Sequence, residues 1–94
     1  MSDLTDKEIE SALAQKVMGY ERPWTWHPLT RIEHAMQLIP KMREKGWGWD
    51  GSIRGDSGEY DMAFYSIEHE LETSSVHRSP ARAISMAAYE AICR

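Results

Sequence analysis

The residues that could do chemistry gather first in a short aromatic segment. Trp24, Trp26 and His27 are close neighbours in the chain, and Arg31 follows them. Two indoles could hold a nucleobase between them, each stacking contact being worth about 1–3 kcal/mol, while the imidazole and the guanidinium contact a phosphate. The alternative is that Trp26 closes the core, because a small domain depends on its largest side chains. Both interpretations stay open at the level of sequence.

A second polar cluster precedes the last predicted helix. Ser75, His77, Arg78 and Ser79 stand directly before Pro80. Free backbone amides at a helix N-terminus attract anions, and a guanidinium adds charge-assisted hydrogen bonds. The alternative is ordinary capping by Ser79, with Arg78 in solvent. A nucleotide-binding site drawn from both clusters would contain six residues: Trp24, Trp26, His27, Arg31, His77 and Arg78.

Other kinds of site have less support in the sequence. The chain contains none of the motifs of nucleophile elbows, phosphate-binding loops, dinucleotide-binding turns or zinc proteases, so we expect no enzymatic activity. Its four histidines lack the spacing of zinc ligands, so we expect neither a metal nor another cofactor. Glu68, Glu70 and Glu72 alternate along a predicted strand and could form an acidic ridge for a basic protein surface. The alternative for these glutamates is a solvated strand edge that opposes aggregation.

Length and charge restrict the classes of protein further. Ninety-four residues form one domain, predicted to span residues 1–94. The net charge of −4 and the absence of a stripe of lysine and arginine argue against direct nucleic-acid binding. The single Cys93 excludes an intrachain disulfide and suits a reducing cytoplasm. We find neither a basic leader with an apolar core nor a long apolar segment, so we expect no signal peptide and no membrane span.

Local signals mark the first and the last helix. Thr5 and Glu8 have the spacing of a capping box and predict a helix over residues 5–18. Ser79 is a favourable N-cap followed by a proline at the first helical position, which predicts a helix over residues 79–92.

The signals for a second helix are mixed. Thr30 and Glu33 repeat the capping-box spacing and predict a helix over residues 30–45. Pro40 lies inside this helix, removes one backbone donor and predicts a kink or a break. The apolar periodicity gives the predicted buried face: Ile32, Ala35, Met36, Ile39 and Met42.

The region between the second and last helices predicts strands. Residues 47–54 alternate in polarity, residues 55–58 are rich in turn formers, and residues 60–67 are rich in aromatic and apolar side chains. A third, weaker strand is predicted at residues 71–76. Short connections make the sheet antiparallel, and a small sheet needs helix cover. The predicted fold is α+β, a small α/β/α sandwich in the order α-α-β-β-β-α.

Several segments also occur in an order and spacing that resemble a known family. They are Val17-Met18-Gly19, Trp26-His27-Pro28, Lys41-Met42-Arg43-Glu44-Lys45-Gly46 and Pro80-Ala81-Arg82-Ala83-Ile84. Together they resemble the phage ABA-sandwich domain family of bacteriophages and prophages, over residues 4–92. The resemblance implies a phage origin, an α/β/α sandwich and a location in the cytoplasm of the infected bacterial host. It implies no particular activity.

Two functions are compatible with these observations. The first is a non-enzymatic phage accessory protein that counters host defence by sequestering a nucleotide-type immune signal. The second is a phage inhibitor that binds a host defence protein, such as a CRISPR or restriction component, through an acidic and aromatic surface. In either case strand edges and exposed aromatic residues favour a homo-oligomer, with a symmetric dimer as the default expectation.

Overall fold

The computed structural model describes residues 5–20, 25–66, 68 and 70–92. Its elements are α1 (Asp6–Leu13), the π-helical turn η1 (Ala14–Met18), α2 (Ile32–Met36), α3 (Leu38–Glu44), β1 (Trp47–Ile53), β2 (Tyr60–Ser66), β3 (Leu71–His77) and α4 (Pro80–Ile92). The predicted α+β class and the order α-α-β-β-β-α are confirmed, with the second helix divided into α2 and α3.

The capping box at the start of α1 forms as predicted. The Glu8 amide donates to Thr5 Oγ1 at 3.2 Å, and the Thr5 amide donates to the Glu8 carboxylate at 3.3 Å. The helix then widens into the π-helical turn η1 and ends at Gly19, whose φ of 74° is a left-handed conformation that suits glycine. Two local signals therefore fix both ends of this segment.

The second helix departs from its predicted start and predicted buried face. The capping box of Thr30 and Glu33 does not form, because residues 27–31 make a turn in which the Thr30 amide bonds to the His27 carbonyl, at 3.2 Å. Helix α2 begins only at Ile32, which is 41% exposed instead of buried. Met36, also predicted to be buried, is 47% exposed.

The predicted break is confirmed and explains the change of face. Gln37 separates α2 from α3. Pro40 has no amide to donate to the Met36 carbonyl and its ring clashes with that carbonyl in a regular helix. The break shifts the apolar stripe, so that Leu38 and Met42 are buried together with Ala35.

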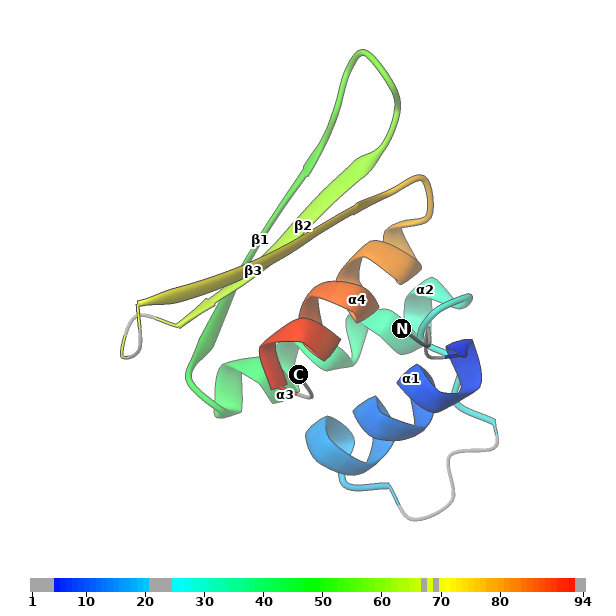
Figure 1. Cartoon of the computed structure of the whole chain (residues 1–94), viewed down its shortest axis with the longest axis vertical. Coiled ribbons are helices and arrows are strands. Elements are labelled where there is room, and N and C mark those ends of the chain that lie inside the picture. The colour runs from blue at the N-terminus through cyan, green and yellow to red at the C-terminus, as the bar shows by residue number, and fades with distance from the viewer. Residues whose placement is uncertain (1–4, 21–24, 67, 69, 93–94) are drawn as a thin grey trace.

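The three strands form one antiparallel sheet in the order β1-β2-β3. The β1–β2 connection is the predicted turn at residues 55–58, where Gly58 has a φ of 72°. The Arg54 amide donates to the Glu59 carbonyl at 2.8 Å and closes the hairpin. Figure 1 shows that this hairpin projects beyond the helices.

The helices all lie on one side of the sheet (Figure 1). Helix α4 packs across β2 and β3, α3 packs against β1, and α1 contacts α4 on the side away from the sheet. The layer arrangement thus differs from the predicted α/β/α sandwich, because no described helix covers the second face of the sheet. The core between sheet and helices includes Phe64, Leu13 and Ile84.

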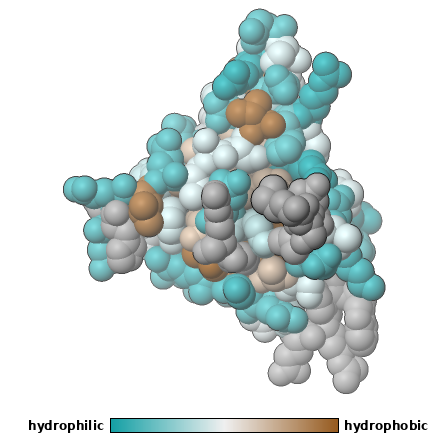
Figure 2. Space-filling model, viewed as in Figure 1, coloured by the Kyte–Doolittle hydropathy of each residue, from teal (hydrophilic) through white to brown (hydrophobic). Residues whose placement is uncertain are grey.

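Among the described residues, the following large apolar side chains are exposed: Tyr20, Ile32, Met36, Trp49, Ile53, Tyr65 and Leu71. Figure 2 shows hydrophobic residues in separate small patches on a mostly hydrophilic surface. Single apolar residues are common on protein surfaces and need no special explanation. Among the described helices, none has both the length and the apolar character needed to cross a membrane.

Candidate functional site

The aromatic loop, of which the structure describes residues 25–29, packs into the protein through Trp26. Trp26 is only 6% exposed, and its indole N–H donates to Gln37 Oε1 at 3.0 Å. The Tyr20 ring meets it edge-on, with ring centroids 5.5 Å apart. A stacking platform needs a free ring face, and Trp26 has none of useful size. The interpretation of Trp26 as a core residue therefore fits the structure, and its predicted role as an open stacking surface does not.

Hydrogen bonds fix residues 27–29 of this loop. The Glu10 carboxylate accepts a hydrogen bond from the Leu29 amide at 3.2 Å and lies 3.3 Å from His27 Nδ1. The buried Ser85 hydroxyl on α4 donates to the Pro28 carbonyl at 2.8 Å. These bonds tie the loop to α1 and α4. Residues 27–29 of the loop are therefore held in place against the core.

The other predicted binding residues do not come together into one site. Trp24 lies outside the described residues. Arg31 is exposed and pairs with Glu33 at 2.9 Å. His77 is half-buried at the end of β3, and Arg78 is exposed beside it. Over residues 5–20, 25–66 and 70–92, no hydrogen bond or ion pair joins the aromatic loop to the cluster before α4.

The cluster before α4 shows ordinary helix capping. The Arg82 amide donates to Ser79 Oγ at 3.3 Å, as expected when a serine caps the third amide of a helix. Pro80 occupies the first helical position as predicted. The hydroxyl that could have helped to hold an anion is thus already used by the helix.

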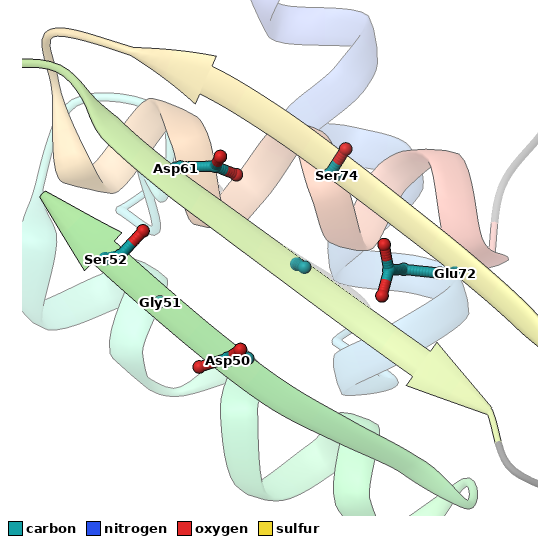
Figure 3. A pocket seen from close by; sticks show the side chains of 7 residues that line it. Asp50, Gly51, Ser52, Asp61, Glu72 and Ser74 are labelled. Atoms are coloured by element: carbon teal, nitrogen blue, oxygen red, sulfur yellow. The ribbon is translucent and has the colours of Figure 1, made fainter. Parts of the chain in front are cut away.

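A hollow of about 240 Å³ lies instead on the uncovered face of the sheet. Figure 3 shows its side chains rising from three neighbouring strands, with the helices behind the sheet. Its lining consists of polar and small residues: Asp50, Gly51, Ser52, Asp61, Ala63, Glu72 and Ser74. We call this surface the acidic face.

Strand register explains the shape of the acidic face. Ala63 stands at its centre, paired with Asp50 on β1 and with Ser74 on β3. Asp61 precedes Ala63 by two residues on the same side of β2, which places it roughly 6.6 Å along the strand. Directly paired side chains lie about 4.5–5.5 Å apart. A methyl group is therefore surrounded by longer polar side chains, and this difference in length leaves the hollow.

The acidic face has an excess of negative charge. Three carboxylates, those of Asp50, Asp61 and Glu72, share it with one guanidinium, since Arg54 lies 3.5 Å from Asp61. In the part of the chain that the structure describes, Asp50 and Glu72 take part in no ion pair. The face can therefore attract cationic groups.

An aromatic side chain borders the acidic face. Tyr65 is 37% exposed, and its ring lies across Gly48 on the neighbouring strand. Any larger residue at position 48 would meet this ring, because an added Cβ would fall 2.5 Å from Tyr65 Cε2. Tyrosine combines apolar contact area with a hydroxyl group and is common in protein interfaces.

The acidic ridge predicted at Glu68, Glu70 and Glu72 is wrong in its composition. Glu68 and Glu70 belong to the turn between β2 and β3, where Glu70 has a positive φ of 53°. The alternation of side chains holds only within a strand, and the chain reverses here. Only Glu72 reaches the sheet, where it lines the same hollow as the two aspartates of β1 and β2 that sequence reasoning missed.

A second hollow, of about 380 Å³, lies between η1 and α3. Lys16, Lys41 and Lys45 border it together with Glu44. Both helical segments end here, so their free carbonyl groups carry a partial negative charge that the lysines offset. Lys41 also lies 3.8 Å from Glu44, so part of the positive charge at this hollow is offset within the protein.

The described residues include no group of three or more histidine, cysteine or acidic side chains that could hold a metal ion. No protein-family model matches the chain, and comparison with curated proteins and with solved structures gave no match either. The resemblance to the phage ABA-sandwich family, like the nucleotide-binding role, therefore stays a prediction.

Proposed function

We propose that this protein is a non-enzymatic binding protein that docks a basic surface of a partner protein on its acidic face. The observation that carries the proposal is the hollow over Ala63, which receives carboxylates from all three strands. Lysine and arginine side chains of the partner would pair with the carboxylates of Asp50, Asp61 and Glu72, which line this hollow. These carboxylates favour a cationic group over a neutral one.

The charge of the face decides between a protein and a nucleotide as the ligand. Phosphate groups are anionic, and an excess of two negative charges repels them. The buried ring of Trp26 also removes one of the two stacking surfaces that the nucleotide hypothesis needs. Sequestration of a nucleotide-type signal stays a prediction with less support than protein binding.

The chemistry of the partner follows from the same face. A protein that binds nucleic acid presents clustered lysine and arginine side chains to neutralise phosphates. CRISPR and restriction components bind nucleic acid, so the predicted counter-defence role fits a partner of this kind. The predicted homo-oligomer also remains part of the proposal, because the sheet has strand edges on both sides.

Removal of two carboxylates tests the proposal. The variant Asp50→Asn with Glu72→Gln keeps both side-chain shapes and takes away two negative charges from the face. An exposed ion pair contributes about 0.2–1 kcal/mol, so affinity for a labelled arginine-rich peptide should fall about 2- to 30-fold, as measured by fluorescence anisotropy.

The matched control removes two charges elsewhere. Glu33→Gln with Glu44→Gln alters two exposed carboxylates on the helical side, whose side chains are 57% and 67% exposed. This control should bind the peptide as the wild type does. Equal weakening by both double variants would show a general charge effect and would contradict the proposal. Binding of cyclic oligonucleotides or ADP-ribose derivatives that depends on Arg31 and Arg78 would favour sequestration instead.

A further inference from the structure

The free edge of β1 has few of the features that usually protect an edge strand, Asp50 being its one charged side chain. It is an outer strand of the sheet, and residues 49–53 are all exposed. Natural proteins protect such edges with lysine, proline, a bulge or a covering segment. Residues 47–53 include no lysine, arginine or proline, and Asp50 is the only charged side chain among them. This edge is therefore suited to pair with another strand.

Hydrogen bonding in the hairpin shows which backbone groups are free. The Arg54 amide donates to the Glu59 carbonyl, so the backbone of Arg54 faces β2. Backbone groups in an antiparallel strand alternate between the two sides. Residues 48, 50 and 52 therefore also face β2, while Trp49, Gly51 and Ile53 direct their amide and carbonyl groups outward.

We propose that two copies of this chain pair along β1, antiparallel, with Gly51 on the two-fold axis. Trp49 then lies opposite Ile53 of the second copy, and Asp50 lies opposite Ser52 of the second copy. About six backbone hydrogen bonds join the strands, since each outward-facing pair exchanges two. The result is a continuous six-stranded sheet.

Side-chain exposure supports this register. Trp49 and Ile53 are 37% and 65% exposed on the face of the sheet that the helices cover elsewhere. Pairing around Gly51 brings Trp49 of each copy against Ile53 of the other copy. An aromatic side chain paired with a β-branched one is among the favourable cross-strand combinations.

Other registers are less favourable. A pairing centred on Asp50 sets two carboxylates directly opposite each other, which is destabilising. A pairing centred on Trp49 requires a second strand beside Trp47, which is only 8% exposed and lies where α3 packs against β1. Pairings centred beyond Gly51 leave Trp49 without a strand residue opposite it. The Gly51 register alone pairs the whole exposed stretch.

The dimer places both acidic faces on the same side of the six-stranded sheet, because rotation about an axis normal to a sheet does not exchange the two faces of the sheet. The two Asp50 carboxylates then lie diagonally, roughly 7–8 Å apart. Salt screens this repulsion, so self-association should strengthen with ionic strength. The inference stands on the strand edge and does not require that the acidic face bind a partner.

Sedimentation velocity on the full chain tests the inference. The wild type should shift from monomer to dimer between about 10 μM and about 1 mM, as expected for a small interface. Ile53→Lys places a charge on the proposed edge and should weaken dimerisation at least about tenfold. Leu71→Lys is the matched control, because Leu71 is 56% exposed on the opposite outer strand, and it should dimerise as the wild type does. A chain that stays monomeric throughout, or a dimer lost with Leu71→Lys but kept with Ile53→Lys, would overturn the inference.

Oxidative cross-linking tests the register. In a Cys93→Ser background, D50C/S52C should form a covalent dimer, because positions 50 and 52 are directly opposed across the axis. D50C alone should not, because two Cα atoms more than about 7 Å apart cannot be bridged. Efficient cross-linking of D50C alone would show an Asp50-centred pairing and would refute the Gly51 register.

Discussion

Replacement of Trp26 by alanine decides whether the aromatic loop is a core element or a binding surface. Only 6% of the Trp26 surface is exposed to solvent. Truncation of a buried tryptophan to alanine costs about 3–5 kcal/mol. A domain of this size has a total stability of about 5–15 kcal/mol, so the variant should lose a large part of it.

Two further substitutions divide this cost into its parts. Gln37→Ala leaves the ring in place but removes the acceptor that lies 3.0 Å from the indole nitrogen, and should cost about 1 kcal/mol. Trp26→Phe keeps an aromatic ring but loses both the N–H donor and part of the volume, so it should lie between the other two variants. Urea unfolding followed by circular dichroism gives all three values, provided that the slope of the transition stays constant.

The result that would refute this reasoning is specific. If Trp26→Ala unfolds at the wild-type urea midpoint, the ring does not support the core. If the same variant also loses affinity for a nucleotide in calorimetry, the stacking hypothesis regains its support. The packing predicts that the loss of unfolding free energy is largest in Trp26→Ala, intermediate in Trp26→Phe and smallest in Gln37→Ala.

Three smaller perturbations follow from single contacts. Ser85→Ala should cost about 1–3 kcal/mol in urea unfolding, because it leaves the buried Pro28 carbonyl without its donor at 2.8 Å. Thr5→Ala should cost about 0.5–2 kcal/mol by the same measurement, because it removes the N-cap of α1. The hydrogen bonds from Arg82 hold the pKa of Asp6 below its ordinary value, so this pair stabilises the fold at neutral pH and its contribution disappears as the pH falls below about 4. The pair lies at the surface and contributes at most about 1 kcal/mol, so Asp6→Asn should be slightly less stable than the wild type at pH 7 and equal to it in acid.

Features that depend on a few neighbouring residues were predictable from the sequence. The capping box of Thr5, the N-cap Ser79 and the turn at Gly58 all occur where the sequence places them. Each of these signals acts within one turn of backbone, so no distant part of the chain needs to be known. The break before Pro40 belongs to the same group, because the missing amide affects only the preceding helical turn.

Predictions failed where a distant or competing contact determined the outcome. Thr30 and Glu33 have the correct spacing for a capping box, but the Thr30 amide already donates to the His27 carbonyl in the turn that begins at His27. Glu10 and Ser85, which hold this turn in place, are remote in sequence. A local pattern could not reveal them.

The candidate site was missed for a related reason. Asp50, Asp61 and Glu72 share no motif and become neighbours only through the pairing of three strands. A shift of one residue in either pairing would send the carboxylate of the shifted strand to the opposite face. The acidic ridge predicted from Glu68, Glu70 and Glu72 extended a strand through a turn, and so included two glutamates that the sheet does not contain.

Strand polarity nevertheless held information about the layers that the prediction of an α/β/α sandwich did not use. A face that packs under a helix needs apolar side chains. On one face β1 and β2 place Trp47, Met62 and Phe64, which are buried. The other face consists of small and polar residues around Ala63, with Tyr65 as its only large aromatic side chain. A second helical layer would have to bury Asp50, Asp61 and Glu72 without enough cations to pair them, and burial of unpaired charge is costly. The alternation within β1 and β2 therefore already argues for a one-sided sheet, and the open acidic face is a consequence of that alternation.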